Sequence, residues 1–346
     1  MSVLITGGAG YIGSHVCVEF LKAGHDIVLF DNFSNSRFDV VAQIEKITGQ
    51  KLKVIIGDLL DKKSIRSVFD NFNIGCVVHL AALKSPEESL SQALDYYENN
   101  ISGTINLLKI MQDKSCKKLI FSSSATVYGE NNSVPNHEKQ KITEAKNPYG
   151  TTKIMIEKII FDICKSNSNW KIISLRYFNP IGADKSGLIG DSPQKNEKNI
   201  MPLIINVAKD INKKFYITGN DFDTPDGTGI RDYIHVSDLA EGHLKAFDYI
   251  NNITGYEIFN LGTGHGYSVL ELIKTFERVN NVKINYEFKA KRFGDLAISY
   301  ADITKAKKIL NWQAKRNLDD MCRDSWRFAV KKIHDKYHIT QNNDII

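Results

Sequence analysis

Short runs of apolar residues recur along the first half of the chain, and few polar side chains interrupt them. Six such runs lie at 2–6, 26–30, 53–56, 76–80, 118–121 and 171–175. Strands that are buried on both faces of a sheet have this composition. Stretches with apolar residues at helical spacing lie between the runs, at 11–23, 61–73, 94–113 and 149–165. The alternation predicts an α/β fold with a doubly wound parallel sheet, whose ligands bind at the carboxyl ends of the strands.

The second half of the chain loses this regular alternation. A chain of 346 residues is long enough for about two domains. We therefore expect a first domain over 1–180 and a smaller α/β domain mainly over 181–335, some segments of which return to the first. The last residues, 336–346, have the composition of a tail.

Composition argues against several classes of protein. No apolar run reaches the ~18 residues that cross a bilayer, and no basic stretch precedes an apolar signal segment. The five cysteines form no C-x-x-C pair, and the nine histidines show no metal-ligand spacing. The formal charge of +5 is spread along the chain without a dense basic patch. We expect a cytoplasmic protein that needs no metal and binds neither membrane nor nucleic acid.

The first apolar run ends in a glycine-rich turn, TGGAGYIGSH, which opens the first helix. Gly7, Gly10 and Gly13 have a spacing that permits a tight turn and brings the main chain close to a pyrophosphate at the helix N-terminus. Asp31 ends the second strand, 18 residues after Gly13, where a carboxylate accepts hydrogen bonds from the adenine ribose. A carboxylate there would repel the 2′-phosphate of NADP. The first domain is therefore predicted to be a Rossmann-type domain that binds NAD.

A candidate catalytic group lies in the stretch NPYGTTK, where Tyr149 and Lys153 share one face of a helix. Ser124 ends the fifth strand, in FSSSATVYG. Tyrosine has a pKa of about 10, but a lysine ammonium and a positive nicotinamide ring both favour its phenolate. Tyr149 could then accept a hydroxyl proton while the carbon gives its hydride to NAD. Lys153 would also hold the nicotinamide ribose, and Ser124 would orient the reacting oxygen, so the trio predicts oxidation of a secondary alcohol.

The glycine loop followed by Tyr-x-x-x-Lys resembles the extended short-chain dehydrogenase/reductase family. A closer resemblance, to the UDP-glucose and UDP-galactose 4-epimerases, runs through nearly the whole chain. It is carried, in order and spacing, by TGGAGYIGSH, FDNFSNS, LAALK, YYENN, FSSSATVYGE, NPYGTTK, LRYFNPIGA, GTGIRDYIHVSDLAEGH, NLGTGHGYSVLE and GDLAISYAD. The resemblance implies an isomerase that oxidises C4 of a UDP-hexose transiently, restores NAD in each cycle and forms a homodimer.

The resemblance also implies which residues form the two binding sites. The NAD site would consist of Gly7, Gly10, Tyr11, Ile12, Gly13, Asp31, Asn32, Asn35, Ser36, Asp58, Leu59, Ala81, Lys84, Asn99, Tyr149, Lys153 and Phe178. The UDP-sugar site would consist of Lys84, Ser124, Tyr149, Asn179, Asn199, Arg231, Tyr233, Arg292, Asp295 and Ser299. The two arginines suit a diphosphate, because guanidinium groups offer bidentate hydrogen bonds.

The residue type at position 299 bears on the choice of substrate. The resemblance places a tyrosine there, against the C2 substituent of the sugar, in members that act on hexoses only. Ser299 leaves room for an acetamido group, which a bulky side chain would exclude. We therefore expect activity on UDP-N-acetylglucosamine and UDP-N-acetylgalactosamine, and also on UDP-glucose and UDP-galactose. The alternative is a hexose-only enzyme, which a one-residue shift to Tyr300 would favour.

Two more distant alternatives share the glycine loop. A nucleotide-sugar 4,6-dehydratase needs an acid and a base directly after the fifth strand, but Ala125 and Thr126 occupy these positions. A non-catalytic NAD sensor would have no need of Tyr149 and Lys153. The sequence therefore favours an enzyme.

Overall fold

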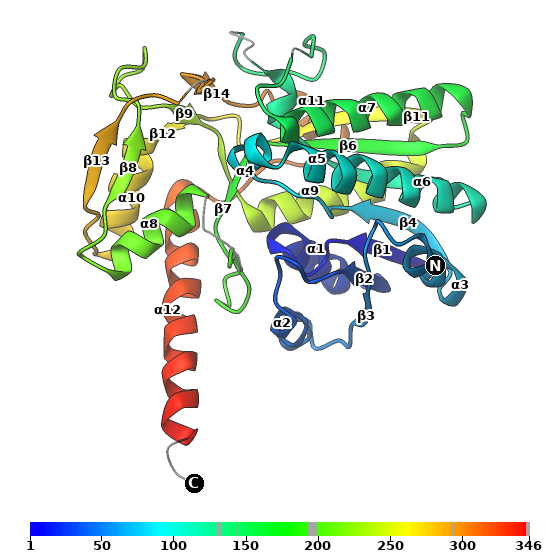
Figure 1. Cartoon of the computed structure of the whole chain (residues 1–346), viewed down its shortest axis with the longest axis horizontal. Coiled ribbons are helices and arrows are strands. Elements are labelled where there is room, and N and C mark those ends of the chain that lie inside the picture. Colours follow the sequence, from blue (N-terminus) through cyan, green and yellow to red (C-terminus); the bar gives the residue numbers. More distant parts are fainter. Residues whose placement is uncertain (130–132, 143, 193–198, 293, 344–346) are drawn as a thin grey trace.

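Figure 1 shows the fold of the whole chain in a computed structural model. The described residues are 1–129, 133–142, 144–192, 199–292 and 294–343, with side chains as far as Lys331. The tail expected at 336–346 falls on residues whose side chains lie outside the described part. Among the described residues, no helix is both long and apolar enough to cross a membrane.

A parallel sheet of seven strands forms the centre of the larger part of the molecule (Figure 1). The strand order is β11-β6-β5-β4-β1-β2-β3. The bounds are β1 Ser2–Thr6, β2 Ile27–Asp31, β3 Lys53–Ile56, β4 Ile74–His79, β5 Lys118–Ser124, β6 Lys171–Tyr177 and β11 Gly255–Leu261. The six apolar runs form the predicted strands, and the doubly wound α/β fold is confirmed, but β3 lies at the edge of the sheet and is partly exposed instead of buried on both faces. The seventh strand, β11, comes from the second half of the chain and pairs with β6.

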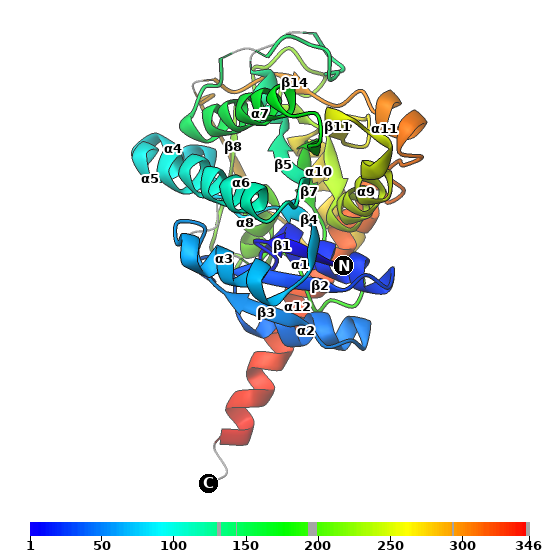
Figure 2. The same cartoon turned by 90° about the vertical axis from the view of Figure 1, so that its right-hand side faces the viewer.

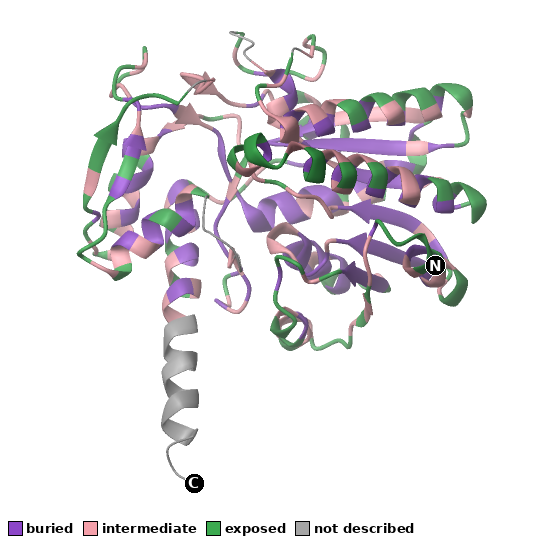
Figure 3. Ribbon diagram, viewed as in Figure 1, coloured by how far each residue is buried: buried purple, intermediate pink, exposed green. Residues whose placement is uncertain are grey.

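Helices cover both faces of this sheet (Figure 2). One face carries α1 Tyr11–Lys22, α2 Asp39–Thr48, α9 Val236–Tyr249, the 3-10 helix η3 Ile250–Asn252 and α11 Thr304–Ile309. The other face carries α3 Lys62–Asn71, α6 Gly103–Asp113 and α7 Pro148–Ser166. Successive strand residues point to opposite faces, so Ile5 packs under the first set of helices and Leu4 under the second. Figure 3 shows the inner strands buried between these two layers.

The helix expected at 94–113 is not a single α-helix. After α4 Pro86–Ser91, this part of the chain forms α5 Ala93–Tyr97, the π-helix η1 Glu98–Ser102 and then α6. A π-turn inserts one residue into a helix and so re-aims the side chains beside it. Here the Asn100 amide reaches the loop after β4, where it bonds the main-chain N–H and C=O of Leu83 at 2.8 and 3.0 Å. These two polar contacts, which apolar spacing does not reveal, accompany the break.

The chain leaves the sheet at the carboxyl ends of β6 and β11 to form a smaller part, at the left of Figure 1. A third apolar core lies there, among α8 Ile200–Lys209, β8 Phe215–Thr218, α10 Val269–Asn280, β13 Tyr286–Lys289 and α12 Leu318–Asn343. Short strands join the two parts: β7 Asn179–Ile181 pairs with β10 Tyr233–His235, and β9 Ile230–Arg231 lies between β12 Tyr267–Ser268 and β14 Ile298–Ser299. Distant segments are thereby held together beside the sheet.

Candidate active site

The glycine loop after β1 has no room for side chains. A Cβ on Gly7, whose φ is +69°, would lie 2.7 Å from the main-chain nitrogen of Ala81. A Cβ on Gly13 would lie 2.1 Å from the carbonyl oxygen of Gly7. Gly10 caps α1 without a side-chain hydrogen bond, so Tyr11 begins a helix whose N-terminus remains open. This bare loop at a helix N-terminus fits the pyrophosphate of a dinucleotide.

Asp31 connects the glycine loop with the loop after β2. Its buried carboxylate accepts hydrogen bonds from the N–H of Ala9 at 3.0 Å, the N–H of Phe33 at 2.8 Å and the hydroxyl of Ser36 at 3.0 Å. The neighbouring Asn32 donates from Nδ2 to Asp58 Oδ2 at 2.8 Å, across the ends of β2 and β3. A fixed negative charge at this place suits a ribose with free hydroxyls and disfavours a 2′-phosphate.

The remaining NAD candidates differ in how their side chains lie. Asn35 and Lys84 are exposed, and Lys84 Nζ lies 5.8 Å from the centre of the Tyr11 ring. Asn99, on the π-helix, donates from Nδ2 to the Asn100 amide oxygen at 2.9 Å. The Leu59 side chain is buried in the core against α6, so a ligand could reach only its main chain. Ile12 is partly buried at the start of α1, and Ala81 faces Gly7. Phe178 is packed with Val127, Tyr128 and Ala301.

The three catalytic candidates come together at the carboxyl end of β5. Tyr149 lies in the first turn of α7, where the Asn147 side chain caps the helix by accepting from the N–H of Gly150 at 2.8 Å. Its hydroxyl lies beside Ser124, close enough for Ser124 to influence its pKa. Lys153 is buried one turn further along, and its Nζ lies 5.8 Å from the centre of the Tyr149 ring. The helix spacing has therefore placed the lysine beside the tyrosine, as the sequence predicts.

The protonation preferences of this group differ from the simple expectation of a low tyrosine pKa. Burial raises the pKa of Tyr149, and the hydrogen bond with Ser124 works against that rise. Burial lowers the pKa of Lys153 to about 7, against the opposing charge of Glu157. A buried phenolate without a nearby cation is unfavourable. Tyr149 can therefore act as a base only where positive charge is held beside it.

The sequence reasoning missed the polar groups behind the catalytic trio. Glu157 accepts from the hydroxyl of Ser123 at 2.5 Å and from Arg176 at 3.0 and 2.6 Å, in a fully buried ion pair. The Tyr177 hydroxyl forms a hydrogen bond with His243 Nε2. Burial raises the pKa of Tyr177, and the nearby Tyr149 raises it further. One signal was present: Glu157 follows Lys153 by four residues and so shares its helix face.

The UDP-sugar candidates lie on the short strands that join the two parts. Ser299 pairs with Arg231 between β14 and β9, and Asn179 pairs with Tyr233 between β7 and β10. The Tyr233 side chain, only 1% exposed, is buried in the third apolar core. Tyr233 therefore offers almost no surface to a ligand in this structure, which the sequence does not predict. Burial lowers the pKa of Arg231.

The second arginine of the candidate site is close enough to interact with the first. Burial is the main influence on Arg231, and the charges of Asp295 and Arg292 also act on it. Asp295 accepts from Arg292 Nε at 3.1 Å and Nη2 at 3.2 Å. Asn199, at the start of α8, donates to Asp191 at 2.8 Å. Two guanidinium groups thus lie near enough to influence each other, an arrangement that suits the negative charges of a diphosphate.

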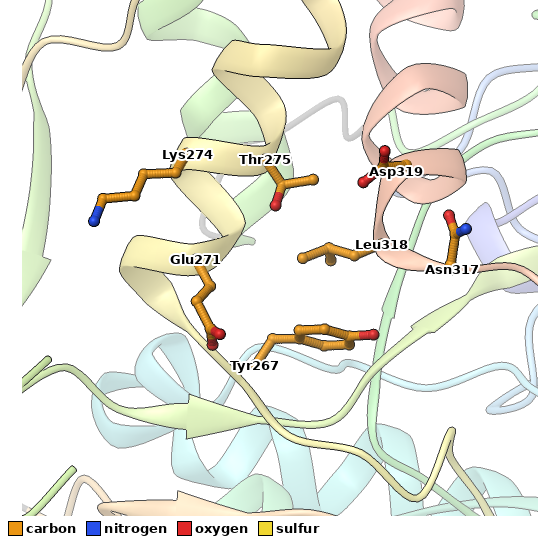
Figure 4. A pocket seen from close by; sticks show the side chains of 7 residues that line it. All are labelled: Tyr267, Glu271, Lys274, Thr275, Asn317, Leu318 and Asp319. Atoms are coloured by element: carbon orange, nitrogen blue, oxygen red, sulfur yellow. The ribbon is translucent and has the colours of Figure 1, made fainter. Parts of the chain in front are cut away.

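A pocket of about 410 Å³ lies elsewhere, between α10 and the start of α12 (Figure 4). Its described lining is Tyr267, Glu271, Lys274, Thr275, Asn317, Leu318 and Asp319. None of these is a predicted site residue, and Glu271 is already held in the capping box of α10. The pocket is separate from the arrangement around Tyr149.

Comparison with known proteins agrees with this geometry. Residues 3–262 match the family described as the NAD dependent epimerase/dehydratase family. A UDP-glucose 4-epimerase of Bacillus subtilis (strain 168) is 48% identical over 339 residues, which cover 96% of this chain and 98% of the relative.

Two solved structures are similar over almost their whole length. One is UDP-glucose 4-epimerase from Bifidobacterium longum in complex with NAD+ and UDP, with a TM-score of 0.93, 44% identity and coverage of 96% of this chain and 98% of that chain. The other is the UDP-Glc/GlcNAc 4-epimerase of Campylobacter jejuni, with a TM-score of 0.83, 34% identity and coverage of 95% and 99%.

Proposed function

The chain belongs to the NAD dependent epimerase/dehydratase family and is an NAD-dependent 4-epimerase, an isomerase of UDP-hexoses; we propose that its main reaction interconverts UDP-glucose and UDP-galactose. The observation that carries the proposal is the placement of Tyr149 beside both Ser124 and the buried Lys153. The relatives named as UDP-glucose 4-epimerases support plain hexoses better than the N-acetylated sugars that Ser299 alone suggests.

The protein's own residues would handle the proton of the sugar 4-hydroxyl. NAD, when bound, accepts the hydride of the sugar C4 and returns it. Tyr149 takes the hydroxyl proton, and Ser124 holds the oxygen through its hydroxyl. The Lys153 ammonium supplies the positive charge that the Tyr149 phenolate needs. The glycine loop and Asp31 hold the cofactor, with Asn32, Asp58 and the π-helix residue Asn99 around it.

Sugar recognition would come from the short strands and from the two arginines. Arg231 and Arg292 donate to the diphosphate, with Asp295 orienting Arg292. Asn179 and Asn199 surround the rest of the nucleotide sugar, and the buried Tyr233 pairs with Asn179. The arginine contacts would persist while the 4-keto sugar rotates to present its other face, because they hold the diphosphate and not the reacting ring.

The experiment is direct. Purified protein is incubated with UDP-galactose, and the products are separated by anion-exchange chromatography. UDP-glucose must appear without added NADH or net change in NAD, because the cofactor is restored in each cycle. Formation of a stable 4-keto-6-deoxy sugar would indicate a dehydratase, and binding without turnover would indicate a sensor.

A second candidate function is the interconversion of UDP-N-acetylglucosamine and UDP-N-acetylgalactosamine. The supporting observation is the short side chain of Ser299, which pairs with Arg231 and whose Oγ accepts from Asn136 Nδ2 at 3.4 Å. The Campylobacter relative is named for both kinds of sugar. Activity on N-acetylated sugars stays a prediction, with plain hexoses as the primary substrates.

We also propose that the protein is a cytoplasmic homodimer. Large apolar side chains are exposed on α4, α5 and α7, which pack beside one another: Leu90 is 66%, Leu94 83% and Phe161 50% exposed. A second copy of this chain would cover them. All five cysteines are buried and free, which fits a reducing compartment.

A further inference from the structure

Asp232 is a buried carboxylate between two candidate substrate residues, Arg231 and Tyr233. Its side chain accepts four hydrogen bonds. Oδ1 receives them from the N–H of Thr263 at 2.8 Å and its hydroxyl at 2.7 Å. Oδ2 receives them from the N–H of Gly264 at 3.0 Å and the N–H of Ala301 at 3.1 Å. The two oxygens of a carboxylate have about four acceptor positions, so this group is fully used.

The main chain of Asp232 makes two further connections. Its N–H donates to the carbonyl oxygen of Ser299 at 3.0 Å, and its carbonyl oxygen accepts from the N–H of Asn179 at 2.9 Å. The side chain binds Thr263 and Gly264 in the loop after β11, and it also binds Ala301, two residues after Ser299. One residue therefore joins the strands that carry Arg231, Asn179 and Ser299.

The surroundings leave the carboxylate little freedom. A Cβ on Gly262 would lie 2.4 Å from Asp232 Oδ2, so the loop can approach only because a glycine stands there. Burial raises the pKa of Asp232, and the hydrogen bonds from Thr263, Gly264 and Ala301 work against that rise. A buried acceptor surrounded by main-chain donors is costly to replace, because each lost bond leaves a buried N–H without a partner.

We propose that Asp232 is a positioning residue for the UDP-sugar, an inference that rests on the proposed function. Asp232 touches none of the groups that move the proton. It sets the relative positions of Arg231, Asn179 and Ser299, which approach the substrate from three separate segments of the chain. Misplacing such groups by about 1 Å weakens binding and orientation strongly.

The test compares Asp232→Asn with Asp238→Asn. The new amide keeps the shape, but whichever way it lies its NH2 group faces main-chain N–H donors of Thr263 or of Gly264 and Ala301. Asp238 is a control of equal burial: it accepts from the N–H groups of Lys315 and Arg316 at 3.1 and 2.9 Å, and it also forms an ion pair with the Arg316 guanidinium at 2.5 Å, so its loss should cost stability at least as much. It touches no candidate substrate residue among those bonds.

We expect Asp232→Asn to raise KM for UDP-galactose by about tenfold or more and kcat to change less, with the amount of bound NAD unchanged. Asp238→Asn should lower the Tm at least as much and leave KM within about twofold of wild type. Equal KM values in the two variants would overturn the positioning role, because both would then act only through stability.

A milder pair decides the question if Asp232→Asn does not fold. Thr263→Val removes one of the four hydrogen bonds to Asp232, together with the contacts of the Thr263 hydroxyl with the main chain of His265, and Thr263→Ser keeps them all. The valine variant should raise KM by about threefold and the serine variant should restore it. Wild-type KM in both would overturn the inference while the proposed function stands. A wild-type protein that turns over no UDP-hexose would overturn both.

Discussion

Lys153 donates a hydrogen bond from Nζ to the main-chain oxygen of Ser122 at 2.7 Å. This bond fixes the amine under the end of β5, two residues before Ser124. The same Nζ lies 4.9 Å from the centre of the Phe121 ring and 5.8 Å from that of Tyr149. A charge held between a carbonyl oxygen and two aromatic rings can stabilise a tyrosine phenolate, although burial acts against both charged forms.

Tyr149→Phe should nearly abolish epimerisation. The substitution removes the hydroxyl that lies beside Ser124 and leaves the ring, so kcat should fall by at least about 100-fold while UDP binding is retained. Turnover is measured with UDP-galactose and binding by titration calorimetry with UDP. Tyr256→Phe is the control, because its hydroxyl bonds Ser174 at 2.9 Å in the sheet. Full activity in the Tyr149 variant would rule out its role as base.

The stability of the ligand-free protein should rise with pH because of Lys153. Its pKa is lowered from 10.5 to about 7, so between these values the unfolded chain binds the proton more strongly than the folded chain. The contribution of Lys153 to stability is then fully present above the pKa of lysine in the unfolded chain. It decreases as pH falls toward 7, by up to about 1.4 kcal/mol per pH unit.

The measurement is urea unfolding of wild type and Lys153→Met at pH 7 and pH 9. As pH rises from 7 to 9, the free energy of unfolding should increase more for wild type than for the variant. A larger increase for the variant than for wild type would mean that the folded protein binds the Lys153 proton more strongly than the unfolded chain does.

Gly13→Ala should destroy retention of NAD. The new Cβ would lie 2.1 Å from the Gly7 oxygen, so the loop must move away from the pyrophosphate position. Purified wild type should carry NAD without addition, and the variant should carry about tenfold less. Gly75→Ala is the control, since the three atoms nearest to its Cβ all belong to the Met1 side chain, far from the glycine loop's own contacts. Wild-type protein that is free of NAD and exchanges it rapidly would contradict this prediction.

Ser299→Tyr should separate the two substrate pairs. If Ser299 lies beside C2 as proposed, wild type should convert UDP-N-acetylglucosamine as well as UDP-glucose. The tyrosine would fill the room beside C2, so the variant should lose at least about tenfold in kcat/KM for the N-acetylated pair and keep the hexose reaction. A wild type inactive on UDP-N-acetylglucosamine would leave the hexose-only alternative.

Leu94→Lys should weaken the proposed dimer. Leu94 is 83% exposed on α5, and a charge buried at an interface is unfavourable. Light scattering at micromolar concentration should give a dimer for wild type and a larger monomer fraction for the variant. Ile211→Lys, at a residue 77% exposed in the smaller part, should leave the dimer intact. A monomeric wild type would refute the proposal.

The sequence by itself determined the features that depend on neighbouring residues. The apolar runs form parallel strands, all buried except the edge strand β3, and the spacing of Gly7 and Gly13 fits the close turn that the structure contains. The i,i+4 spacing of Tyr149 and Lys153 places them together, because both lie on one helix. Local geometry of helices and strands repeats over a few residues, so such patterns can be read along the chain.

Only the tertiary structure decided the features that depend on contacts between distant residues. The π-turn accompanies the bonds between Asn100 and Leu83, and Tyr233 is buried in a core built from several segments. The raised pKa of Tyr149 comes from burial. The hydrogen bonds of Asp232 with Thr263 and Ala301 form only because the fold brings these distant residues together. Burial and long-range hydrogen bonds arise between segments far apart in sequence, and no local pattern encodes them.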